Sequence, residues 1–337
     1  MPTTLDNISR LERSQKKSLS DVTLCCVDCT ERAPWALQAL QRSLRELSIS
    51  DAVFCADQAT LRALRLPEGV RGIEIEPLCS IEAYSEFMLK ALGPHIKTSH
   101  VLVIQWDGFV LNSDAWCAEF LEYDYIGAPW RHIPIPYSVG NGGFSLRSRR
   151  LIDMLAEPAF VPSHPEDLAI CCTHRDALER RGIRFAPISL ANRFAIEDGA
   201  LQADTFGFHG AQHLPQVLAP EELLAFVQSL EPKVLHSHFF GEFLRNLRCA
   251  AANDAAVRPA YIAFKEFLTR AVESLSGDAA LTPLALGVCK ALVRHGQYDA
   301  AARLLHLRRL ASGRCEHKLW LRLKLKSALA RFAGNGL

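Results

Sequence analysis

The sequence predicts an α/β protein in which a doubly wound sheet, with helices on both faces, is followed by an all-helical C-terminal region. Over residues 21–108, short apolar runs with strand character alternate with segments whose apolar residues recur at helical spacing. After about residue 220 only helical patterns remain. The chain has 337 residues, 49% of them hydrophobic, which is enough for one large α/β domain and a smaller second one.

The first third of the chain predicts four strands and two helices. In chain order they are expected at 21–29 (strand), 31–47 (helix), 51–57 (strand), 72–78 (strand), 80–96 (helix) and 101–108 (strand). Pro34 lies near the start of the first helix, where its missing N–H leaves no hydrogen bond unmade. Ser80 is the expected N-cap of the second helix, which Gly93 and Pro94 end. The last strand is almost wholly apolar, as a central parallel strand is.

From Asp124 onward, aromatic residues, prolines and glycines are dense, and strands are expected to alternate with loops. Gly182 has the position of a helix C-cap. The expected elements are 149–158 (helix), 165–182 (helix), 183–197 (strand, then loop) and 205–210 (short strand).

The C-terminal region predicts two amphipathic helices over 285–310, joined at His295-Gly296, in a hairpin similar to a tetratricopeptide unit. Such arrays need about three repeats, so a single helical appendage on the main domain is the simpler interpretation. The run 317–332 alternates apolar and basic residues. Packing of its Leu and Trp side chains on protein is the commoner arrangement, and a peripheral contact with an anionic membrane surface is the alternative. These helices are also candidates for joining two copies of the chain.

Composition excludes several classes of protein. A net charge of +1 provides no basic field for nucleic acid. No apolar run approaches the roughly 20 residues of a membrane helix, and the N-terminus lacks the apolar core of a secretion signal. We therefore expect a cytoplasmic protein, peripheral at the inner membrane at most. It is divided into a flexible arm at 1–20, a ligand-binding α/β domain at 21–220 and a helical region at 221–337.

Cys26 and Cys29 have the spacing of a thioredoxin-type Cys-x-x-Cys motif. The aromatic-Gly-Pro context of that motif is missing, and no second pair is present to complete a zinc site. Most of the eleven cysteines lie in apolar runs, which favours buried thiols that act as small hydrophobic side chains. A thiol redox protein remains an alternative, and it requires a lowered thiol pKa.

Asp107 follows the fourth apolar strand, and a carboxylate at the C-terminal end of such a strand points to the edge where α/β sheets bind ligands. Mg²⁺ and Mn²⁺ prefer oxygen ligands of this kind, and a divalent cation there would neutralise a diphosphate leaving group. Gln105 offers only a neutral oxygen where many such sites have a second acid. The simpler interpretation of Asp107 is a cap on the turn before Gly108.

The run VGNGGFSLRS predicts a glycine turn that leads into a strand. Gly140, Gly142 and Gly143 permit positive φ and a close approach of the backbone to a ligand. Asn141 tolerates left-handed geometry and can hydrogen-bond a sugar hydroxyl. Because Asn-Gly is a strong turn signal, a tight hairpin is the alternative.

Two further features complete the candidate site. Glu166 and Asp167 open a predicted helix, where they suit the positive end of its dipole or place a general base near an acceptor hydroxyl. His209, after a short strand, is a candidate metal ligand, although a lone histidine is more often structural. His236 and His238 are weaker alternatives.

In this order, QWDGF at 105–109, DYIGAPW at 124–130, GNGGFSLR at 140–147 and the pair Glu166-Asp167 resemble the signature of an uncharacterised bacterial family of glycosyltransferase-like domains. The likeness covers roughly residues 20–215. That family is in turn similar to GT-A glycosyltransferases. The resemblance therefore implies a GT-A-like Rossmann-type sheet that binds a nucleotide sugar over residues 21–220.

The resemblance also implies residue roles. Asp107 would hold a Mn²⁺ or Mg²⁺ ion, with His209 as a further metal ligand, and Asp167 would be the base, with Glu166 as its catalytic neighbour. The residues implied on the donor side are Asp28, Thr30, Gln105, Asp107, Asn141, Gly142, Gly143 and Phe144. Gln105 stands where the related enzymes have a first Asp, which leaves the metal dependence open.

The leading hypothesis is an inverting glycosyltransferase that moves a sugar from a nucleotide-diphospho-sugar to the hydroxyl of a glycan or another acceptor, in cell-surface glycan biosynthesis. The competing hypothesis is a sugar-nucleotide-binding or glycan-binding scaffold without turnover, which the missing acid at Gln105 motivates. Release of nucleoside diphosphate would distinguish the two.

Overall fold

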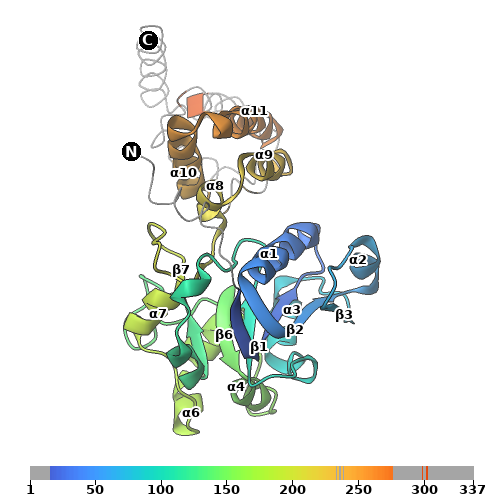
Figure 1. The fold of residues 1–337 in the computed structure, drawn as a ribbon, viewed down its shortest axis with the longest axis vertical. Coiled ribbons are helices and arrows are strands. Elements are labelled where there is room, and N and C mark those ends of the chain that lie inside the picture. Colours follow the sequence, from blue (N-terminus) through green and yellow to red (C-terminus); the bar gives the residue numbers. More distant parts are fainter. Residues whose placement is uncertain are drawn as a thin grey trace, which may run out of the picture. The chain divides into compact units, whose positions relative to one another are not determined.

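The computed structural model describes residues 16–232, 234, 237, 239–275, 298, 301 and 302. The chain forms two compact units, Met1–Gly210 and Ala211–Leu337. The first unit confirms the α/β class, since helices surround a six-stranded sheet of order β3-β2-β1-β4-β6-β5 (Figure 1). The second unit is helical where it is described.

The first half of the sheet is parallel. Strand β1 pairs in parallel with β2 and with β4, and β2 pairs in parallel with β3. These strands and the helices between them are β1 (Lys17–Val27), α1 (Ala33–Glu46), β2 (Leu47–Ala56), α2 (Gln58–Ala63), β3 (Val70–Glu74), α3 (Ile81–Lys90), the 3₁₀ helix η1 (Gly93–His95) and β4 (His100–Ile104).

Helices cover both faces of the parallel strands, as the sequence predicts. Neighbouring residues of a strand face opposite sides of the sheet. Cys25 of β1 belongs to a core cluster with Phe87 of α3 and Ile152 of the later helix α4 (Arg149–Leu155). The next residue, Cys26, has its Sγ 3.9 Å from the Ala36 carbonyl of α1. Helix α1 therefore packs on the opposite face from α3 and α4.

The second half of the sheet is antiparallel. Strand β6 (Phe144–Ser148) runs antiparallel to β4 and to β5 (Tyr125–Gly127), with Ile104 opposite Phe144. The sequence predicted β4 to be a central parallel strand. It is central, but it is parallel only to β1, because β6 on its other side runs in the opposite direction. This reversal brings the residues after β4 next to the residues before β6. The short 3₁₀ helices η2 (Ser113–Ala115) and η3 (Ala118–Glu122) precede β5.

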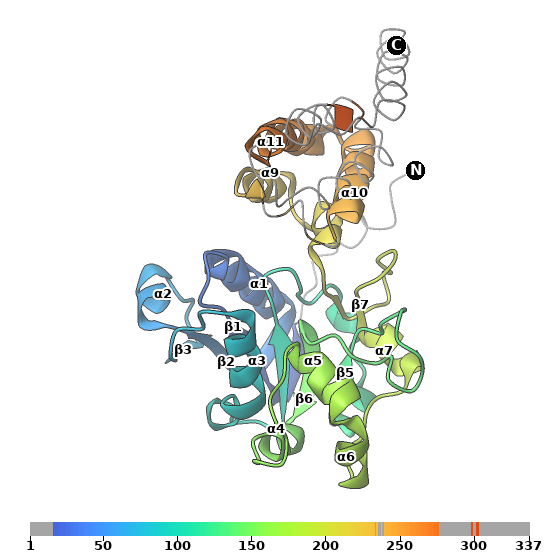
Figure 2. The same cartoon turned by 180° about the vertical axis from the view of Figure 1, so that it is seen from behind.

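Helices α4 (Arg149–Leu155), α5 (Glu166–Leu168) and α6 (Arg175–Arg180) follow β6, and Gly182 ends α6 with φ +84° as the sequence predicts. One core cluster joins Tyr125 of β5 to these helices, which lie beside β5 and β6 in Figure 2. The predicted single helix over 165–182 is wrong in detail. A π-helical turn, η4 (Ala169–Thr173), interrupts it, and α6 starts anew after His174.

Of the strand and loop predicted over 183–197, the loop is wrong, because a helix, α7 (Ile188–Phe194), forms within that range. Leu190, Ala191 and Phe194 recur at helical spacing and are buried, so packing favours the helix. Strand β7 (Ala195–Ile196) follows and pairs in parallel with β8 (Gly207–Phe208), which confirms the short strand predicted at 205–210. Helix α2, six residues long, was not expected from the sequence.

An aromatic cluster fixes the segment that carries β8. Phe144, at the start of β6, lies with its ring centroid 5.3 Å from that of Phe194 in α7 and 5.8 Å from that of Phe206. Phe206 also holds the chain through its carbonyl, which accepts a hydrogen bond from the Leu111 N–H at 2.8 Å. His209, three residues after Phe206, is thereby held against the end of the sheet.

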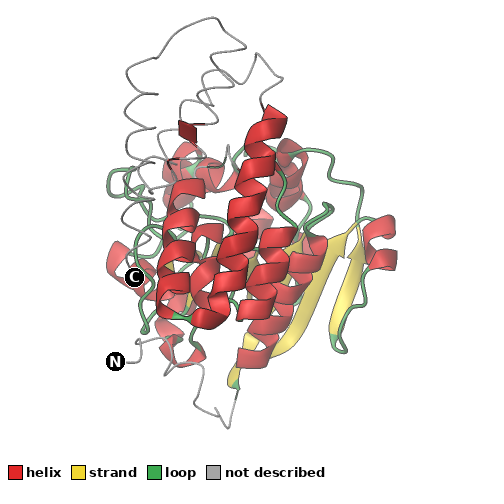
Figure 3. Ribbon diagram, turned by 90° about the horizontal axis from the view of Figure 1, so that it is seen from above, coloured by secondary structure: helices red, strands yellow, loops and turns green. Residues whose placement is uncertain are grey.

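The N-terminal boundary of the α/β unit differs from the predicted one. Strand β1 begins at Lys17 rather than Asp21, because Lys17 and its neighbours pair with the strand that begins at Leu47. The last residues of the expected arm at 1–20 are therefore part of the sheet, shown in yellow in Figure 3. Strand β2 likewise takes in Leu47, which the sequence assigned to the preceding helix.

The boundary between the units lies at Gly210, not at residue 220. The segment after Gly210 belongs to the helical unit, where Asn246 donates to the Gln212 carbonyl at 2.7 Å. Its elements are η5 (Ala211–His213), α8 (Leu214–Val217), α9 (Pro220–Gln228), α10 (Phe240–Asn253), η7 (Ala255–Val257) and α11 (Arg258–Leu275). Phe243 and Phe264 are buried between α10 and α11, with ring centroids 5.4 Å apart.

Several sequence predictions fall outside the described residues. They are His236, His238, the run 317–332 and most of the hairpin predicted at 285–310. Within the described part of the chain, no helix has both the length and the apolar character that crossing a membrane requires.

Replacing Ser80 with alanine is expected to lower the free energy of unfolding by about 1 kcal/mol. The Ser80 side chain caps α3 by accepting a hydrogen bond from the Ala83 N–H at 3.2 Å, as the sequence predicts. Urea denaturation followed by circular dichroism would measure the loss. The matched control is Ser18→Ala at an exposed position of β1. Equal losses in the two variants would contradict the role of the cap.

Candidate functional site

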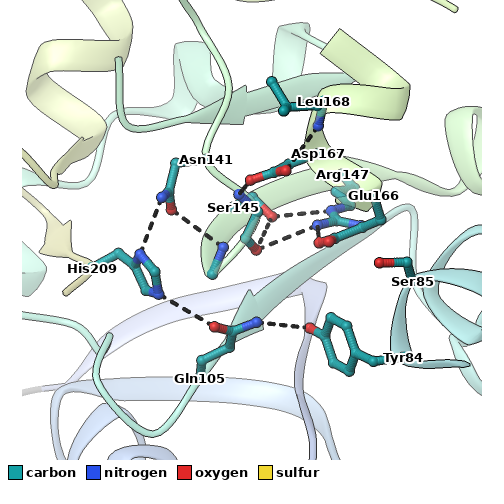
Figure 4. Close-up of polar contacts among 12 residues, drawn as sticks. Tyr84, Ser85, Gln105, Asn141, Ser145, Arg147, Glu166, Asp167, Leu168 and His209 are labelled. Carbon is teal, nitrogen blue, oxygen red and sulfur yellow. Dashed lines mark hydrogen bonds and ion pairs between the residues drawn. The ribbon is translucent and has the colours of Figure 1, made fainter. Parts of the chain in front are cut away.

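Four segments that are far apart in the sequence meet at one edge of the sheet (Figure 4). Residues 105–107 follow β4, the turn 141–143 precedes β6, Glu166 and Asp167 start α5, and His209 follows β8. The antiparallel register of β4 and β6 places the first two segments side by side. The Gly210 N–H donates to the Asp107 carbonyl at 2.9 Å, which ties the fourth segment to the first.

Asp107 and His209 form a buried ion pair. Oδ1 of Asp107 lies 3.3 Å from Nε2 of His209, with side-chain exposed fractions of 10% and 16%. Burial alone raises the pKa of Asp107, but the charge of His209 offsets this effect and the pKa is lowered overall. For His209, burial alone lowers the pKa. The attraction of the Asp107 carboxylate outweighs burial, so the pKa of His209 is raised well above its ordinary value. Asp107 is not simply a turn cap.

The Gln105 amide has a defined orientation in the site. Its Nε2 donates to the Tyr84 hydroxyl at 3.0 Å, and its Oε1 lies 3.3 Å from Nε2 of His209. The amide oxygen therefore faces the same imidazole nitrogen as Asp107. Three possible cation ligands therefore lie close together: the carboxylate of Asp107, the amide oxygen of Gln105 and Nε2 of His209.

The turn 141–143 links the two ends of the site. Asn141 has φ 45°, the left-handed geometry that the sequence predicts for it, and its Nδ2 lies 3.1 Å from Nδ1 of His209. Its Oδ1 accepts a hydrogen bond from the Gly143 N–H at 3.2 Å. The Gly142 N–H donates to Oδ2 of Asp167 at 2.9 Å. The turn thus contacts His209 on one side and Asp167 on the other.

The glycines of this turn are required for space rather than for positive φ. Gly140, Gly142 and Gly143 are absent from the positive-φ glycines of the described residues, so that prediction is wrong. A Cβ at Gly142 would overlap Oε1 of Glu166, and one at Gly143 would overlap the imidazole of His209. The alternative of a tight hairpin is also wrong, because a long connection separates the end of β5 at Gly127 from the start of β6.

Glu166 and Asp167 have different environments although they are adjacent. Glu166 is buried and pairs with Arg147, whose Nη2 lies 3.0 Å from its Oε1. Asp167 accepts hydrogen bonds from the N–H groups of Gly142 at 2.9 Å and Leu168 at 2.8 Å. Burial and then the charge of Glu166 raise the pKa of Asp167. A carboxylate with a raised pKa is suited to act as a general base.

The donors around Asp107 are suited to a cation that takes most of its ligands from substrate and water. Oδ1 of Asp107 is buried and, among the described atoms, makes no well-aligned hydrogen bond. Asp107, His209 and the amide oxygen of Gln105 could hold Mg²⁺ or Mn²⁺ together with diphosphate oxygens. Within the described residues, no three His, Cys, Asp or Glu side chains form a complete metal cluster.

Two of the residues expected on the donor side lie at the end of β1. Oδ1 of Asp28 accepts hydrogen bonds from the N–H and the hydroxyl of Thr30, both at 2.7 Å. Arg32, in the same loop, lies over the ring of Trp106 at 4.6 Å from its centroid. The loop after β1 therefore reaches the segment that carries Gln105 and Asp107.

Phe144 does not line a sugar site as the resemblance implies. Its side chain is fully buried among the aromatic rings that hold α7 and β8, so its role is packing. The redox alternative is also disfavoured. Burial raises the pKa of the Cys26 thiol well above its ordinary value and raises that of Cys29, whereas a reactive pair needs a lowered pKa.

Sequence reasoning missed two charged residues of the site. Oε1 of Glu197 lies 3.4 Å from Nδ1 of His209, and nothing in the sequence around Glu197 indicates this contact. Arg147 is 1% exposed within β6. An arginine in a run that otherwise reads as a buried strand was the available signal, because a buried charge needs a partner.

The comparisons with known proteins give a family match without a function. A family model described as a protein of unknown function (DUF5672) matches residues 69–209. That span contains all four segments of the site, and it ends at His209. No curated protein matches the chain.

Proposed function

We propose that this chain is a GT-A-like glycosyltransferase that moves a sugar from a nucleotide-diphospho-sugar to an acceptor hydroxyl, with inversion at the anomeric carbon. The observation that carries the proposal is the meeting of two acidic centres at one sheet edge. Asp107 forms an ion pair with His209 at 3.3 Å. Asp167 accepts a hydrogen bond from the turn 141–143, and Asn141 of that turn contacts the same histidine. Ligands of α/β sheets bind at the carboxyl ends of the strands, where this edge lies.

The two centres divide the proposed reaction between them. Asp167 accepts the proton of the acceptor hydroxyl while the oxygen of that hydroxyl forms a bond to the anomeric carbon and the bond from that carbon to the diphosphate breaks. A single displacement of this kind inverts the anomeric centre. Asp107, His209 and Gln105 would hold the divalent cation, which would neutralise the charge of the departing diphosphate. The raised pKa of Asp167 supports its assignment as the base.

A thermal-shift screen of nucleoside diphosphates and nucleotide sugars, with and without Mn²⁺, tests the proposal. A bound ligand raises the melting temperature because it binds only the folded state. We expect a rise with a nucleotide sugar, a larger rise with Mn²⁺, and release of nucleoside diphosphate when an acceptor is present. Binding without release would favour a sugar-nucleotide-binding scaffold, and the absence of any shift would contradict both that scaffold and the transferase.

Asp107→Asn is expected to weaken the Mn²⁺-dependent part of nucleotide-sugar binding by on the order of tenfold or more. The substitution keeps the side-chain shape and removes the one carboxylate among the three proposed cation ligands, Asp107, His209 and Gln105. Each variant's melting temperature is compared with and without ligand, so that a change in its own stability does not count. The matched control is Glu119→Gln, at an exposed position of η3. An unchanged Mn²⁺ effect in Asp107→Asn would refute the assigned cation site.

A further inference from the structure

We propose that Arg147 is a positioning residue for the base. It donates hydrogen bonds to the Gly142 carbonyl and to Glu166, and so fixes the glycine whose N–H donates to Asp167. This inference rests on the proposed function for the role of Asp167 as the base. It concerns a residue that touches neither substrate nor cation. The inference is drawn from the position of the Arg147 guanidinium, which is fully buried between the glycine turn and the pair Glu166-Asp167 (Figure 4).

The contacts of Arg147 fix one residue of the turn, Gly142, and one residue of the acidic pair, Glu166. Its Nη2 donates to the Gly142 carbonyl at 3.3 Å and to Oε1 of Glu166 at 3.0 Å. Its Nε donates to the Ser145 hydroxyl at 3.0 Å, and that hydroxyl donates to the same Gly142 carbonyl at 2.9 Å. The N–H of Gly142 then donates to Oδ2 of Asp167 at 2.9 Å. Arg147 and Ser145 thus hold Gly142 through its carbonyl, in the peptide group after its Cα, while Asp167 accepts from its N–H, in the peptide group before its Cα.

Charge gives Arg147 a second effect on the base. Two adjacent carboxylates in a buried setting repel each other, and a buried cation is needed to keep both ionised. The pKa of Asp167 is raised first by burial and next by the charge of Glu166, and the charge of Arg147 opposes this rise. Loss of Arg147 would therefore protonate the base at a higher pH.

The other titratable groups packed around Arg147 and Asp167 do not supply this charge. Burial raises the pKa of Tyr84 in α3, Tyr125 in β5 and Cys171 in η4 well above their ordinary values. The pKa of Cys25 in β1 is also raised, first by its hydrogen bond to Cys55. All four groups stay neutral over the working pH range. Arg147 and Glu166 are therefore the charged neighbours that set the ionisation of Asp167.

The test compares the pH dependence of kcat/KM in Arg147→Met, Arg147→Lys and the wild-type chain. We expect the acid limb of the profile to move up by about one pH unit or more in Arg147→Met. It should move much less in Arg147→Lys, which keeps the charge. The control is Arg175→Met, which removes another buried arginine, one that pairs with Glu179 at 3.0 Å outside the site. A purely structural arginine would lower stability in either position and leave the acid limb in place.

A ¹³C NMR titration of the Asp167 carboxyl, assigned by its loss in Asp167→Asn, measures the same quantity without substrate. An unchanged Asp167 titration in both Arg147 variants would overturn the inference. If Arg147→Met does not fold, Arg147→Gln, which also removes the charge but keeps a polar side chain, replaces it, and a wild-type Asp167 titration in that variant would have the same meaning. If the wild-type chain transfers no sugar, the proposed function fails, and the titration still decides whether Arg147 controls Asp167.

Discussion

Asp167→Asn is expected to lower kcat for sugar transfer by about 10²–10⁴-fold, which is the usual contribution of a positioned general base. The asparagine keeps the shape of the side chain and one of the two oxygens that accept from the N–H groups of Gly142 and Leu168, but it cannot take the proton of the acceptor. Transfer assayed with the donor found in the ligand screen, and with an acceptor that supports release of nucleoside diphosphate, would measure the effect. The control is Asp204→Asn, at an exposed position between α7 and β8. Full activity in Asp167→Asn would exclude this residue as the base.

The same carboxyl predicts the acid side of the pH profile. Its pKa is raised by burial and by Glu166, so activity is lost, as pH falls, at a higher pH than for an ordinary aspartate. The stability effect has the opposite sense. Because the folded state holds this proton more tightly than the unfolded state, the contribution to stability is present at low pH and is lost as pH rises through the folded pKa. The melting temperature of the wild-type chain, measured relative to that of Asp167→Asn, should therefore fall as pH rises through the folded pKa.

The sequence was sufficient to predict where the site residues meet. Asp107 and His209 each follow a strand, Asn141 precedes one, and the acidic pair opens a helix, and the structure brings all of these together. Strand ends that share one edge of a sheet explain this success. The direction of β6 was not predictable in the same way, because an apolar run carries no mark of parallel or antiparallel pairing.

What the sequence could not supply was the identity of the long-range partners. Arg147 and Glu166 are 19 residues apart, and Glu197 and His209 are 12 apart; neither spacing indicates a contact. Of the two reasons that the sequence suggested for the glycines of the turn, positive φ is wrong. Positive φ is a local property that a sequence pattern can suggest. The space that Gly142 and Gly143 leave for Glu166 and His209 depends on the tertiary fold.

Gln105 lowers the affinity that we expect the free site to have for a divalent cation. Its amide is oriented by Tyr84, so its oxygen faces His209 without adding negative charge. One carboxylate is then left to attract the cation, and the phosphate oxygens of the donor must supply the rest of the charge. We therefore expect Mn²⁺ to bind well only with the nucleotide sugar, which is why the ligand screen compares the two together and apart.

Gly142→Ala is expected to lower the free energy of unfolding by about 3–5 kcal/mol, the usual effect of breaking a buried ion pair. The new methyl group would overlap Oε1 of Glu166 and lie 2.9 Å from Nη2 of Arg147 and 3.1 Å from Cβ of Asp167. Both partners of the ion pair are buried, so neither can move into solvent without leaving a charge uncompensated. Because the Gly142 N–H also holds Asp167, transfer should be lost together with stability.

The matched control for Gly142→Ala is Gly93→Ala in η1. A Cβ at Gly93 would lie 3.4 Å from Cγ2 of Ile152 and from Oδ1 of Asp153, which is close to ordinary contact. Urea denaturation of both variants separates the general effect of adding a methyl group from the specific effect at the turn. Similar urea midpoints in the two variants would mean that the Arg147–Glu166 ion pair can shift to make room for the methyl group at little cost in stability. Glu166 could then not be held firmly enough by Arg147 to position the base.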